Sequence, residues 1–482
     1  MLCVILIWME IRREIFRAYD IRGVYGSELT KEGAVAIGRA FGTVLRRQGL
    51  ENPQVVVGRD NRFSSDELSV KLIDGLLSTG CLVTDIGLAV TPFIHFSTTN
   101  YNFDAGVMVT ASHNPKEFNG FRFELKNCTP FYNDSIQGLL KIVENDDFSS
   151  GIGSVTYREN IFDDYVNFLK AKIKIKRRLK IVLDCANASA SKFAPRLFES
   201  LGFEVVGLFC SLDGDYPYHQ PDPEERINLQ TLRLKVCEEK ADLGFGFDAD
   251  ADRFGVVDEK GTSYENDKVL VVLARDLLKK HPGGKVAFDV KSSYVLADAI
   301  KAAGGTPEMI KTGHPYFRQA MISDPNLILA GEVSSHTFIK DGYFGYDDGF
   351  YAAIRVAEVV ARQEKPFSQF FSDVPHTAHT EEIKLPCSDE KKFSIVETVG
   401  EELSNSFDVS KIDGFRISLS PTEWFLIRAS NTGPYISVRF EAETEEKLHQ
   451  LVARAQQSLE RFPEVDLQSL KGIYREKKEH ID

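Results

Sequence analysis

The chain has 482 residues, enough for roughly three domains at about 150 residues each, with room for several hydrophobic cores. Its formal net charge of -13 argues against nucleic acid or an anionic membrane as the main partner, although a small anion can still bind where arginines and lysines gather. The seven cysteines are scattered without a Cys-x-x-Cys motif, which is typical of thiols in a reducing compartment. We therefore expect a cytoplasmic protein without a nucleic-acid or membrane partner.

The apolar run at residues 2–8 is too short to cross a bilayer and lacks a basic flank, so we expect an extra edge strand or a segment ahead of the true initiator, Met9. Beyond it, short apolar runs that each end in a polar loop recur with helical patterns between them, as in α/β proteins. Ligands of open α/β sheets bind beyond the carboxyl ends of strands, so the loops after these runs are candidate sites. The runs are residues 55–57, 105–109, 181–183, 243–247, 286–288 and 327–330.

Three stretches mark candidate domain boundaries. Residues 144–154 are acidic and then rich in serine and glycine, residues 363–380 carry two prolines, and a third break falls around residues 257–266. Toward the end of the chain the pattern changes to alternating strands, such as residues 436–442, followed by one helix over residues 444–461. We therefore predict repeated α/β units at the front and a smaller α+β domain at the end.

Three aspartates directly follow the predicted strand 243–247. Asp248, Asp250 and Asp252 occupy alternate positions, which project to the same side of an extended or looped backbone. Three crowded carboxylates repel one another unless a cation lies between them, and oxygen ligands of this charge suit Mg²⁺ before Ca²⁺. An EF-hand is excluded because its sixth position needs glycine and holds Arg253. The run therefore predicts a magnesium site.

Ser112 lies in the loop Thr110–Pro115, just past the predicted strand 105–109. Because neighbours in an extended strand point to opposite faces, we expect His113 to be badly placed to deprotonate Ser112. The chain also lacks a Gly-x-Ser-x-Gly elbow, which argues against a serine hydrolase. Near a Mg²⁺ site, the hypothesis for Ser112 is a serine that carries a phosphoryl group.

Two further loops offer groups that bind phosphorylated sugars. One combines a carboxylate, hydroxyls and an imidazole, the mixture that binds sugar hydroxyls. The other combines a guanidinium, hydroxyls and an amide, which suit a phosphate dianion. No Gly-x-x-x-x-Gly-Lys-Ser/Thr loop occurs, so nucleotide hydrolysis has little support. The residues are Glu332, Ser334 and His336 in the first loop and Arg428, Ser430, Asn431 and Thr432 in the second.

With these loops in this order, the sequence resembles the α-D-phosphohexomutases, most of all the bacterial phosphomannomutase/phosphoglucomutase branch. The resemblance runs from about Phe16 to Ala442 and is specific because six motifs occur in order. It implies three related α/β domains with mixed sheets and a smaller C-terminal α+β domain around a central cleft, which we place at residues 10–152, 153–258, 259–370 and 371–470. The motifs are residues 16–23, 110–115, 213–223, 248–253, 331–336 and 428–432.

The resemblance implies an enzyme that interconverts hexose 6-phosphate and hexose 1-phosphate, with mannose, glucose or both as the sugar. A phosphoserine would donate its phosphoryl group to the substrate, and a hexose 1,6-bisphosphate would reorient and return the other phosphate. The implied cofactors are Mg²⁺ and glucose 1,6-bisphosphate or mannose 1,6-bisphosphate as activator. Small-molecule hexose phosphates are the expected partners, and the chain is expected to be a monomer or homodimer.

The resemblance also implies a role for each candidate residue. Ser112 would be the phosphoserine and, with Asp248, Asp250 and Asp252, would hold the metal. Arg22 and Arg253 would steady the transferring group, and the catalytic set is completed by His336 and Arg122. The substrate would contact Tyr19, Lys291, His314, Glu332, Ser334, His336, Arg428, Ser430, Asn431 and Thr432.

Departures from the family pattern leave alternatives open. Arg122 stands where relatives commonly have lysine, and arginine does not readily give up a proton, so His336 or a water is left to share the acid/base work. Ser335 stands where relatives often have glycine. The sequence Ser430-Asn431-Thr432 favours glucose or mannose phosphates over the Ser-Gly-Thr usual in phosphoglucosamine mutases. The alternatives are a phosphoglucosamine mutase, a sugar phosphatase and a sugar-phosphate-binding paralogue without turnover.

Overall fold

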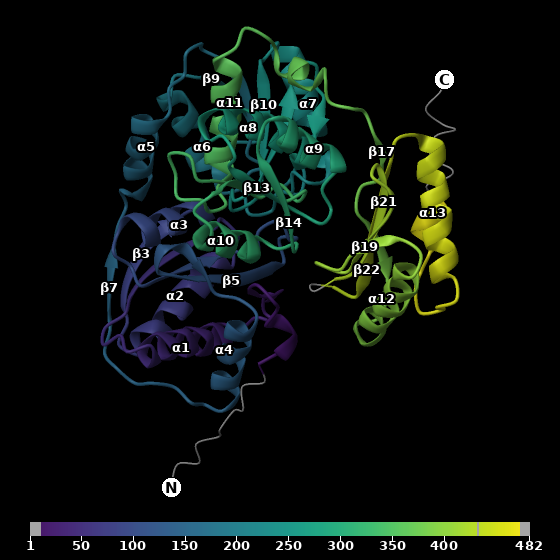
Figure 1. Cartoon of the computed structure of the whole chain (residues 1–482). Coiled ribbons are helices and arrows are strands. Elements are labelled where there is room, and N and C mark those ends of the chain that lie inside the picture. The colour runs from purple at the N-terminus through teal and green to yellow at the C-terminus, as the bar shows by residue number, and fades with distance from the viewer. Residues whose placement is uncertain (1–10, 431–432, 473–482) are drawn as a thin grey trace.

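The computed structural model describes residues 11–430 and 433–472. The apolar run 2–8 and two residues of the predicted phosphate loop, Asn431 and Thr432, lie outside the described residues. The strands form four sheets that follow one another along the chain. Figure 1 shows the first sheet and its helices at the bottom, the second and third above them, and the fourth at the side. The predicted fold class, three α/β units with mixed sheets and a smaller α+β unit, is confirmed.

The first sheet has the strand order β1-β5-β4-β2-β3-β7, with β6 beside β5. Strands β2, β3, β4 and β7 run parallel, whereas β5 is antiparallel to both β4 and β1. The elements are η1 (Arg13–Ile15), β1 (Ile21–Val24), α1 (Lys31–Arg47), β2 (Gln54–Arg59), α2 (Ser65–Leu77), β3 (Leu82–Leu88), α3 (Thr91–Asn100), β4 (Ala105–Val109), β5 (Phe118–Leu125), η2 (Lys126–Cys128), β6 (Thr129–Pro130), α4 (Asp134–Glu144) and β7 (Ser154–Tyr157).

The second sheet repeats part of this plan in the order β12-β11-β10-β8-β9. Strand β8 pairs in parallel with β9 and β10, and β11 returns antiparallel to β10. The elements are α5 (Ile161–Lys172), β8 (Lys180–Asp184), α6 (Ala190–Ser200), β9 (Glu204–Leu208), η3 (Arg226–Leu229), α7 (Gln230–Glu239), β10 (Leu243–Phe247), β11 (Phe254–Asp258) and β12 (Ser263–Tyr264).

The third sheet repeats the plan again in the order β14-β13-β15-β16. Strand β13 pairs in parallel with β14 and β15, and β16 returns antiparallel to β15. The elements are α8 (Asn266–Lys280), β13 (Lys285–Asp289), α9 (Tyr294–Ala302), β14 (Thr306–Ile310), α10 (His314–Ser323), β15 (Leu327–Gly331), β16 (Thr337–Ile339), α11 (Gly349–Ala361) and η4 (Phe367–Phe371).

Three of the predicted site loops occupy equivalent positions in this repeated plan. Ser112 follows β4, Asp248 follows β10 and Glu332 follows β15, and in each sheet the loop joins a parallel strand to its antiparallel return strand. These loops lie at the carboxyl ends of parallel strands, where open α/β sheets bind ligands.

The fourth sheet is antiparallel, in the order β17-β22-β21-β20-β19 with β18 also beside β22. Figure 1 shows α12 and α13 on its outer side. The helix predicted over residues 444–461 is α13, and the side chain of Thr444 caps it by accepting a hydrogen bond from Lys447 N. The elements are β17 (Ala378–His379), β18 (Ile383–Pro386), α12 (Asp389–Ser404), β19 (Asp408–Ser410), β20 (Phe415–Ser420), β21 (Glu423–Ala429), β22 (Tyr435–Ala442), α13 (Glu445–Leu459) and α14 (Gln468–Gly472).

One continuous hydrophobic core joins the first three units, the first unit has a second core of its own on residues 15–142, and the fourth unit has a separate core. In the shared core the ring of Phe93 in the first unit packs 4.9 Å from Phe193 in the second, and Phe247 packs 5.0 Å from Phe350 in the third, measured between ring centroids. Because apolar burial dominates stability, we expect these three units to unfold together. None of the helices in residues 11–430 and 433–472 combines the length and the apolar character that crossing a membrane requires.

Candidate active site

Asp248, Asp250 and Asp252 lie in the turn between β10 and β11 and are fully buried. One oxygen from each lies within 4.8 Å of the others, as their alternate spacing predicts. Ala251 allows the sharp turn with a φ of 56°, and its carbonyl accepts a hydrogen bond from the N–H of Gly349 at the start of α11 (3.0 Å). The sequence therefore places three carboxylates around one point at the end of a buried strand.

The electrostatics of these carboxylates fit a divalent cation. Burial, together with repulsion from Asp252, raises the pKa of Asp250 to about 6, and burial and its two neighbours raise that of Asp248. Burial acts in the same direction on Asp252, but the adjacent Arg122 guanidinium outweighs it and lowers that pKa. Asp250 Oδ1 and Asp252 Oδ1 are buried without a hydrogen-bond partner. Hard oxygen ligands with unsatisfied lone pairs are the donor set that Mg²⁺ requires.

Ser112 faces the aspartate loop from the first sheet. Its Oγ donates a hydrogen bond to Asp248 Oδ2 at 2.9 Å and lies 3.2 Å from His113 Nδ1. The expectation that His113 points away from Ser112 is wrong, because Ser112 has a φ of 49° and is not in an extended strand. A left-handed residue outside glycine costs roughly 1–2 kcal/mol, and such strain concentrates at functional sites.

Arg62, which was not predicted, holds the Ser112 loop in this conformation. Its Nη2 donates to the carbonyl oxygens of Ser112 (2.6 Å) and Asn114 (2.7 Å), and its Nη1 donates to Pro115 O (2.7 Å). Asp60 pairs with the same buried guanidinium through its Oδ2 at 3.0 Å. Asp60 and Arg62 lie just beyond the carboxyl end of β2. This position after a strand was the only feature of the sequence that could have pointed to a role in the site.

Arg22 contacts the Ser112 loop, and Arg253 ends the aspartate loop and contacts His336. Arg22 Nη1 donates to Asn114 Oδ1 at 2.8 Å and its Nη2 pairs with Asp20 at 2.5 Å. Arg253 Nε donates to His336 Nε2 at 3.1 Å. Two cationic groups therefore lie at the loop that carries the candidate nucleophile, where a phosphoryl group needs charge compensation.

Arg122 extends from β5 into the aspartate loop and links two predicted site residues. Its Nη1 contacts Asp252, and its Nη2 lies 2.9 Å from His314 Nδ1. The same Nη2 donates to Asp347 Oδ2 at 2.8 Å, a residue that was not predicted. Burial lowers the pKa of Arg122, but the surrounding carboxylates outweigh it and raise the pKa well above the ordinary value. Arg122 is therefore a fixed positive charge and not a proton donor.

In the loop after β15, the side chains of Glu332 and His336 are buried and that of Ser334 is half-buried. Glu332 Oε1 accepts a hydrogen bond from Gly313 N at 2.6 Å, and burial raises the pKa of Glu332 to about 8. Ser335 has a φ of 75°, which explains physically why glycine is favoured at this position.

Tyr19 contacts residues 312 and 314 of the third unit, and Arg428 is connected to residue 312 through Asp413. Tyr19 Oη donates to Thr312 O at 3.2 Å, and its ring packs edge-on against His314. Arg428 Nε donates to Asp413 Oδ2 at 2.6 Å, and the same oxygen accepts from Thr312 N at 3.1 Å. Asp413 therefore ties the start of the predicted phosphate loop to the rest of the site.

Lys291 and Ser430 complete the described candidates. Lys291 is buried, and its Nζ donates to Glu382 Oε2 at 2.8 Å, which links the third unit to the fourth. Ser430 Oγ accepts a hydrogen bond from Gly433 N at 3.1 Å and so closes the turn before β22. A cleft with walls from all four units adjoins these groups. Its lining includes His113, Asp222, Glu224, Tyr264, Ser335, Glu382, Lys384 and Arg439.

Four family models match the chain in order. Phosphoglucomutase/phosphomannomutase alpha/beta/alpha domains I, II and III match residues 13–150, 163–261 and 265–378, and the C-terminal domain of the same family matches residues 382–457. The chain belongs to the phosphoglucomutase/phosphomannomutase family. The predicted resemblance is therefore confirmed over nearly the whole chain.

Named relatives of this phosphoglucomutase/phosphomannomutase chain agree with the family models. It is 41% identical over 438 residues to a phosphomannomutase/phosphoglucomutase of Pseudomonas aeruginosa, which covers 91% of this chain and 93% of that one. It is 38% identical over 459 residues to a phosphoglucomutase of Neisseria gonorrhoeae, covering 94% and 98%. A solved phosphoglucomutase/phosphomannomutase family structure from Burkholderia thailandensis superposes with a TM-score of 0.88 at 36% identity, covering 95% and 99%.

The described residues of the predicted site fall into two groups within this family fold. One network of direct contacts around the aspartate loop includes Ser112, the three aspartates, Arg253, Arg122, His314 and His336, and Arg22 adjoins it through Asn114 of the Ser112 loop. Tyr19 packs against His314 at the edge of that network, whereas Arg428 is tied to Thr312 through Asp413 and Lys291 is tied to the fourth unit through Glu382. The linking residues were missed because their sequence contexts show no motif.

Proposed function

We propose that this family member is a phosphohexomutase that interconverts hexose 6-phosphate and hexose 1-phosphate through a phosphoserine at Ser112 and a hexose 1,6-bisphosphate. The contact between Ser112 Oγ and Asp248 Oδ2, at 2.9 Å, supports the proposal most directly. The hydroxyl that would act as the nucleophile therefore lies at the edge of a buried three-carboxylate cluster. The names of the Pseudomonas and Neisseria relatives support mannose and glucose as the sugars.

In this proposal Asp248, Asp250 and Asp252 hold Mg²⁺ together with the phosphoryl group on Ser112. The ion would supply charge neutralisation for the transferring phosphoryl group. Arg22 and Arg253 compensate the charge on the remaining phosphoryl oxygens.

The proton transfer falls to His336 or to a water, because Arg122 is fixed as a cation between two carboxylates. Burial lowers the pKa of His336, so its ring is a neutral base near pH 7. The imidazole lies 3.1 Å from the guanidinium of Arg253, beside the transferring group.

The remaining predicted residues would bind the rest of the substrate. We propose that Glu332 and Ser334 contact sugar hydroxyls, with His336 beside them. Tyr19, Lys291 and His314 would line the cleft, and the loop with Arg428, Ser430, Asn431 and Thr432 would hold the phosphate that is not reacting. A second phosphate bound far from the reacting centre lets remote binding energy serve the transfer.

We propose Mg²⁺ as the ion, glucose 1,6-bisphosphate or mannose 1,6-bisphosphate as the activator, and the domain boundaries at residues 10–152, 153–258, 259–370 and 371–470. Hexose phosphates are the proposed partners, acting on a monomer or homodimer.

A coupled assay tests the function with glucose 1-phosphate, mannose 1-phosphate and glucosamine 1-phosphate in the presence of Mg²⁺ and the bisphosphate. We expect turnover of the first two, loss of turnover in Ser112→Ala, and retained substrate binding by that variant. Normal turnover by Ser112→Ala would overturn the mechanism. Tracing ³²P from the phosphoenzyme separates a mutase, which returns label to sugar, from a phosphatase, which releases inorganic phosphate.

A further inference from the structure

Asp347 lies behind the aspartate loop, between β16 and α11, and is fully buried. Its Oδ2 lies 2.8 Å from Arg122 Nη2 and 3.3 Å from His336 Nδ1. Its Oδ1 lies 3.4 Å from His95 Nε2 and 3.6 Å from Arg318 Nε. Its Oδ2 also lies 3.8 Å from His314 Nδ1, so one carboxylate faces five nitrogen-bearing side chains, two of which belong to the proposed catalytic set.

The contacts of His336 determine where its proton lies. Arg253 Nε–H can only donate, so His336 Nε2, at 3.1 Å, accepts a hydrogen bond. A neutral imidazole that accepts at Nε2 carries its proton on Nδ1. That Nδ1 faces Asp347 Oδ2. Asp347 therefore lies where a carboxylate favours the tautomer with the proton on Nδ1, and this tautomer leaves the Nε2 lone pair for Arg253.

Arg122 depends on the same carboxylate. Its guanidinium bridges Asp252 on one side and Asp347 on the other. A guanidinium held from both ends has one orientation, whereas a contact to Asp252 alone would leave it able to rotate. Asp347 therefore positions both His336 and Arg122, the guanidinium next to the aspartate loop.

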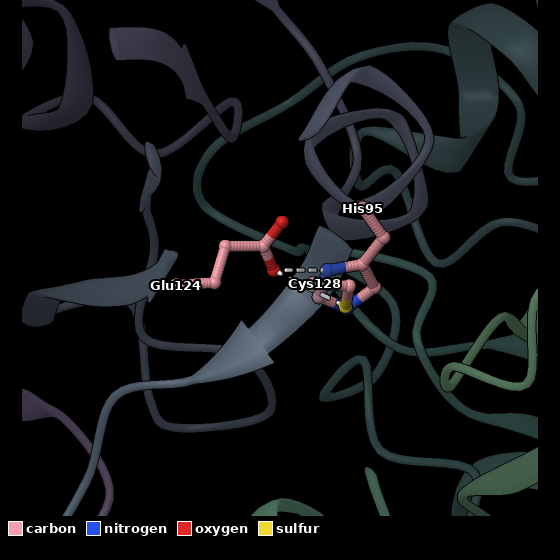
Figure 2. A group of neighbouring side chains, drawn as sticks. All are labelled: His95, Glu124 and Cys128. Atoms are coloured by element: carbon pink, nitrogen blue, oxygen red, sulfur yellow. Dashed lines mark hydrogen bonds and ion pairs between the residues drawn. The ribbon is translucent and has the colours of Figure 1, made fainter. Parts of the chain in front are cut away.

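A buried polar cluster holds Asp347 from behind. Figure 2 shows His95, Glu124 and Cys128 gathered there, with His95 Nδ1 bonded to the Glu124 carboxylate. Their ligand atoms lie within 4.8 Å of one another, as in a metal site. However, Arg318 Nη1 lies 3.2 Å from Glu124 Oε2 and 3.3 Å from Cys128 Sγ, so a guanidinium already provides the cation. The cluster is an ion-pair network that fixes His95 and Arg318 against Asp347.

We propose that Asp347 is a positioning residue for phosphoryl transfer, an inference that rests on the proposed function. It keeps the proton of His336 on Nδ1, so that the Nε2 lone pair holds the guanidinium of Arg253 beside the aspartate loop. Asp347 also fixes Arg122 against Asp252.

The test compares Asp347→Asn with Asp348→Asn in the full-length protein. Asp348 is the adjacent buried carboxylate, but it caps α11 by accepting from Tyr351 N at 2.9 Å and contacts no residue of the proposed catalytic set. We expect Asp347→Asn to lower kcat about 10- to 100-fold, the usual effect of removing a group that orients an active-site ligand, with KM nearly unchanged. Asp348→Asn should keep kcat, and its melting temperature reports any structural cost.

A second measurement uses the wild-type protein and so does not depend on the folding of a variant. The ¹⁵N resonances of the ten histidines are recorded, and His336 is assigned with His336→Gln. We expect His336 in the Nδ1–H tautomer. An Nε2–H tautomer, an unchanged kcat in Asp347→Asn, or a rise in KM without a change in kcat would each overturn the inference. If the wild type turns over none of the three sugar phosphates, the proposed function fails, and the tautomer still tests the role of Asp347 independently.

Discussion

Arg122→Lys tests whether the guanidinium between two buried carboxylates is a structural charge or an exchangeable proton carrier. Lysine keeps the positive charge but has a single ammonium group, which cannot contact Asp252, Asp347 and His314 in the arrangement that the two Nη atoms allow. The variant therefore loses about one charge-assisted hydrogen bond, worth about 1.5–3 kcal/mol, and leaves a buried carboxylate short of a partner.

The loss appears as a lower melting temperature. One kcal/mol shifts the melting temperature of a domain of about 150–250 residues by about 2–4 °C, and by less in a larger cooperative unit. Because the first three units share a core, we expect their common transition to fall by about 2–6 °C in Arg122→Lys. Differential scanning calorimetry with EDTA measures this shift without compensation by bound metal. We also expect kcat to fall, because Arg122 acts through its position and not through a proton.

Arg275→Lys is the matched control. Arg275 makes a two-point contact with Asp373 at 2.9 Å for both nitrogen–oxygen pairs, but both side chains are partly exposed. Exposed pairs contribute about 0.2–1 kcal/mol, so the control should shift the transition little. An Arg122→Lys transition no lower than that of the control would refute the energetic reasoning. A higher kcat in Arg122→Lys would refute the role of Arg122 as a fixed charge.

Two further predictions concern the loop after β15. Burial raises the pKa of Glu332 from its ordinary 4.5 to about 8, so the folded chain holds a proton that the unfolded chain has released, and stability falls as pH rises through this range. Glu332→Gln removes that dependence, so its melting temperature relative to wild type should increase from pH 4.5 to pH 9; an equal difference at both values would contradict the pKa assignment. Ser335→Gly should stabilise the chain by up to about 1 kcal/mol, because the left-handed strain of about 1–2 kcal/mol exceeds the entropy cost of glycine. Ser334→Gly is the control, because Ser334 has no positive φ, and it should lower the melting temperature. An equal fall in melting temperature in both variants would contradict the strain argument.

The sequence alone determined the elements and the chemistry of the loops. Apolar runs such as residues 243–247 become buried strands because their hydrophobicity leaves no other low-energy environment, and polar loops follow them. The spacing of Asp248, Asp250 and Asp252 is local, so their convergence could be predicted from backbone geometry. Six ordered motifs made the family resemblance specific.

The conformation of the Ser112 loop could not be predicted in this way. The expectation that His113 lies on the opposite face assumed an extended backbone, but Ser112 adopts a φ of 49°. Arg62, distant along the chain, stabilises that turn through three carbonyl oxygens. A local rule cannot anticipate a conformation that a distant side chain stabilises.

Only the tertiary structure decided which charges meet. Asp347 carries no motif, yet packing of the segment before α11 against the first unit places it between Arg122, His336 and His95. In the same way, Asp413 and Glu382 join the fourth unit to the third. Sequence patterns report the nature of a side chain and its near neighbours along the chain. Burial and pairing depend on segments that can lie far apart along the chain, so the partners of the buried charges emerge only when those segments pack together.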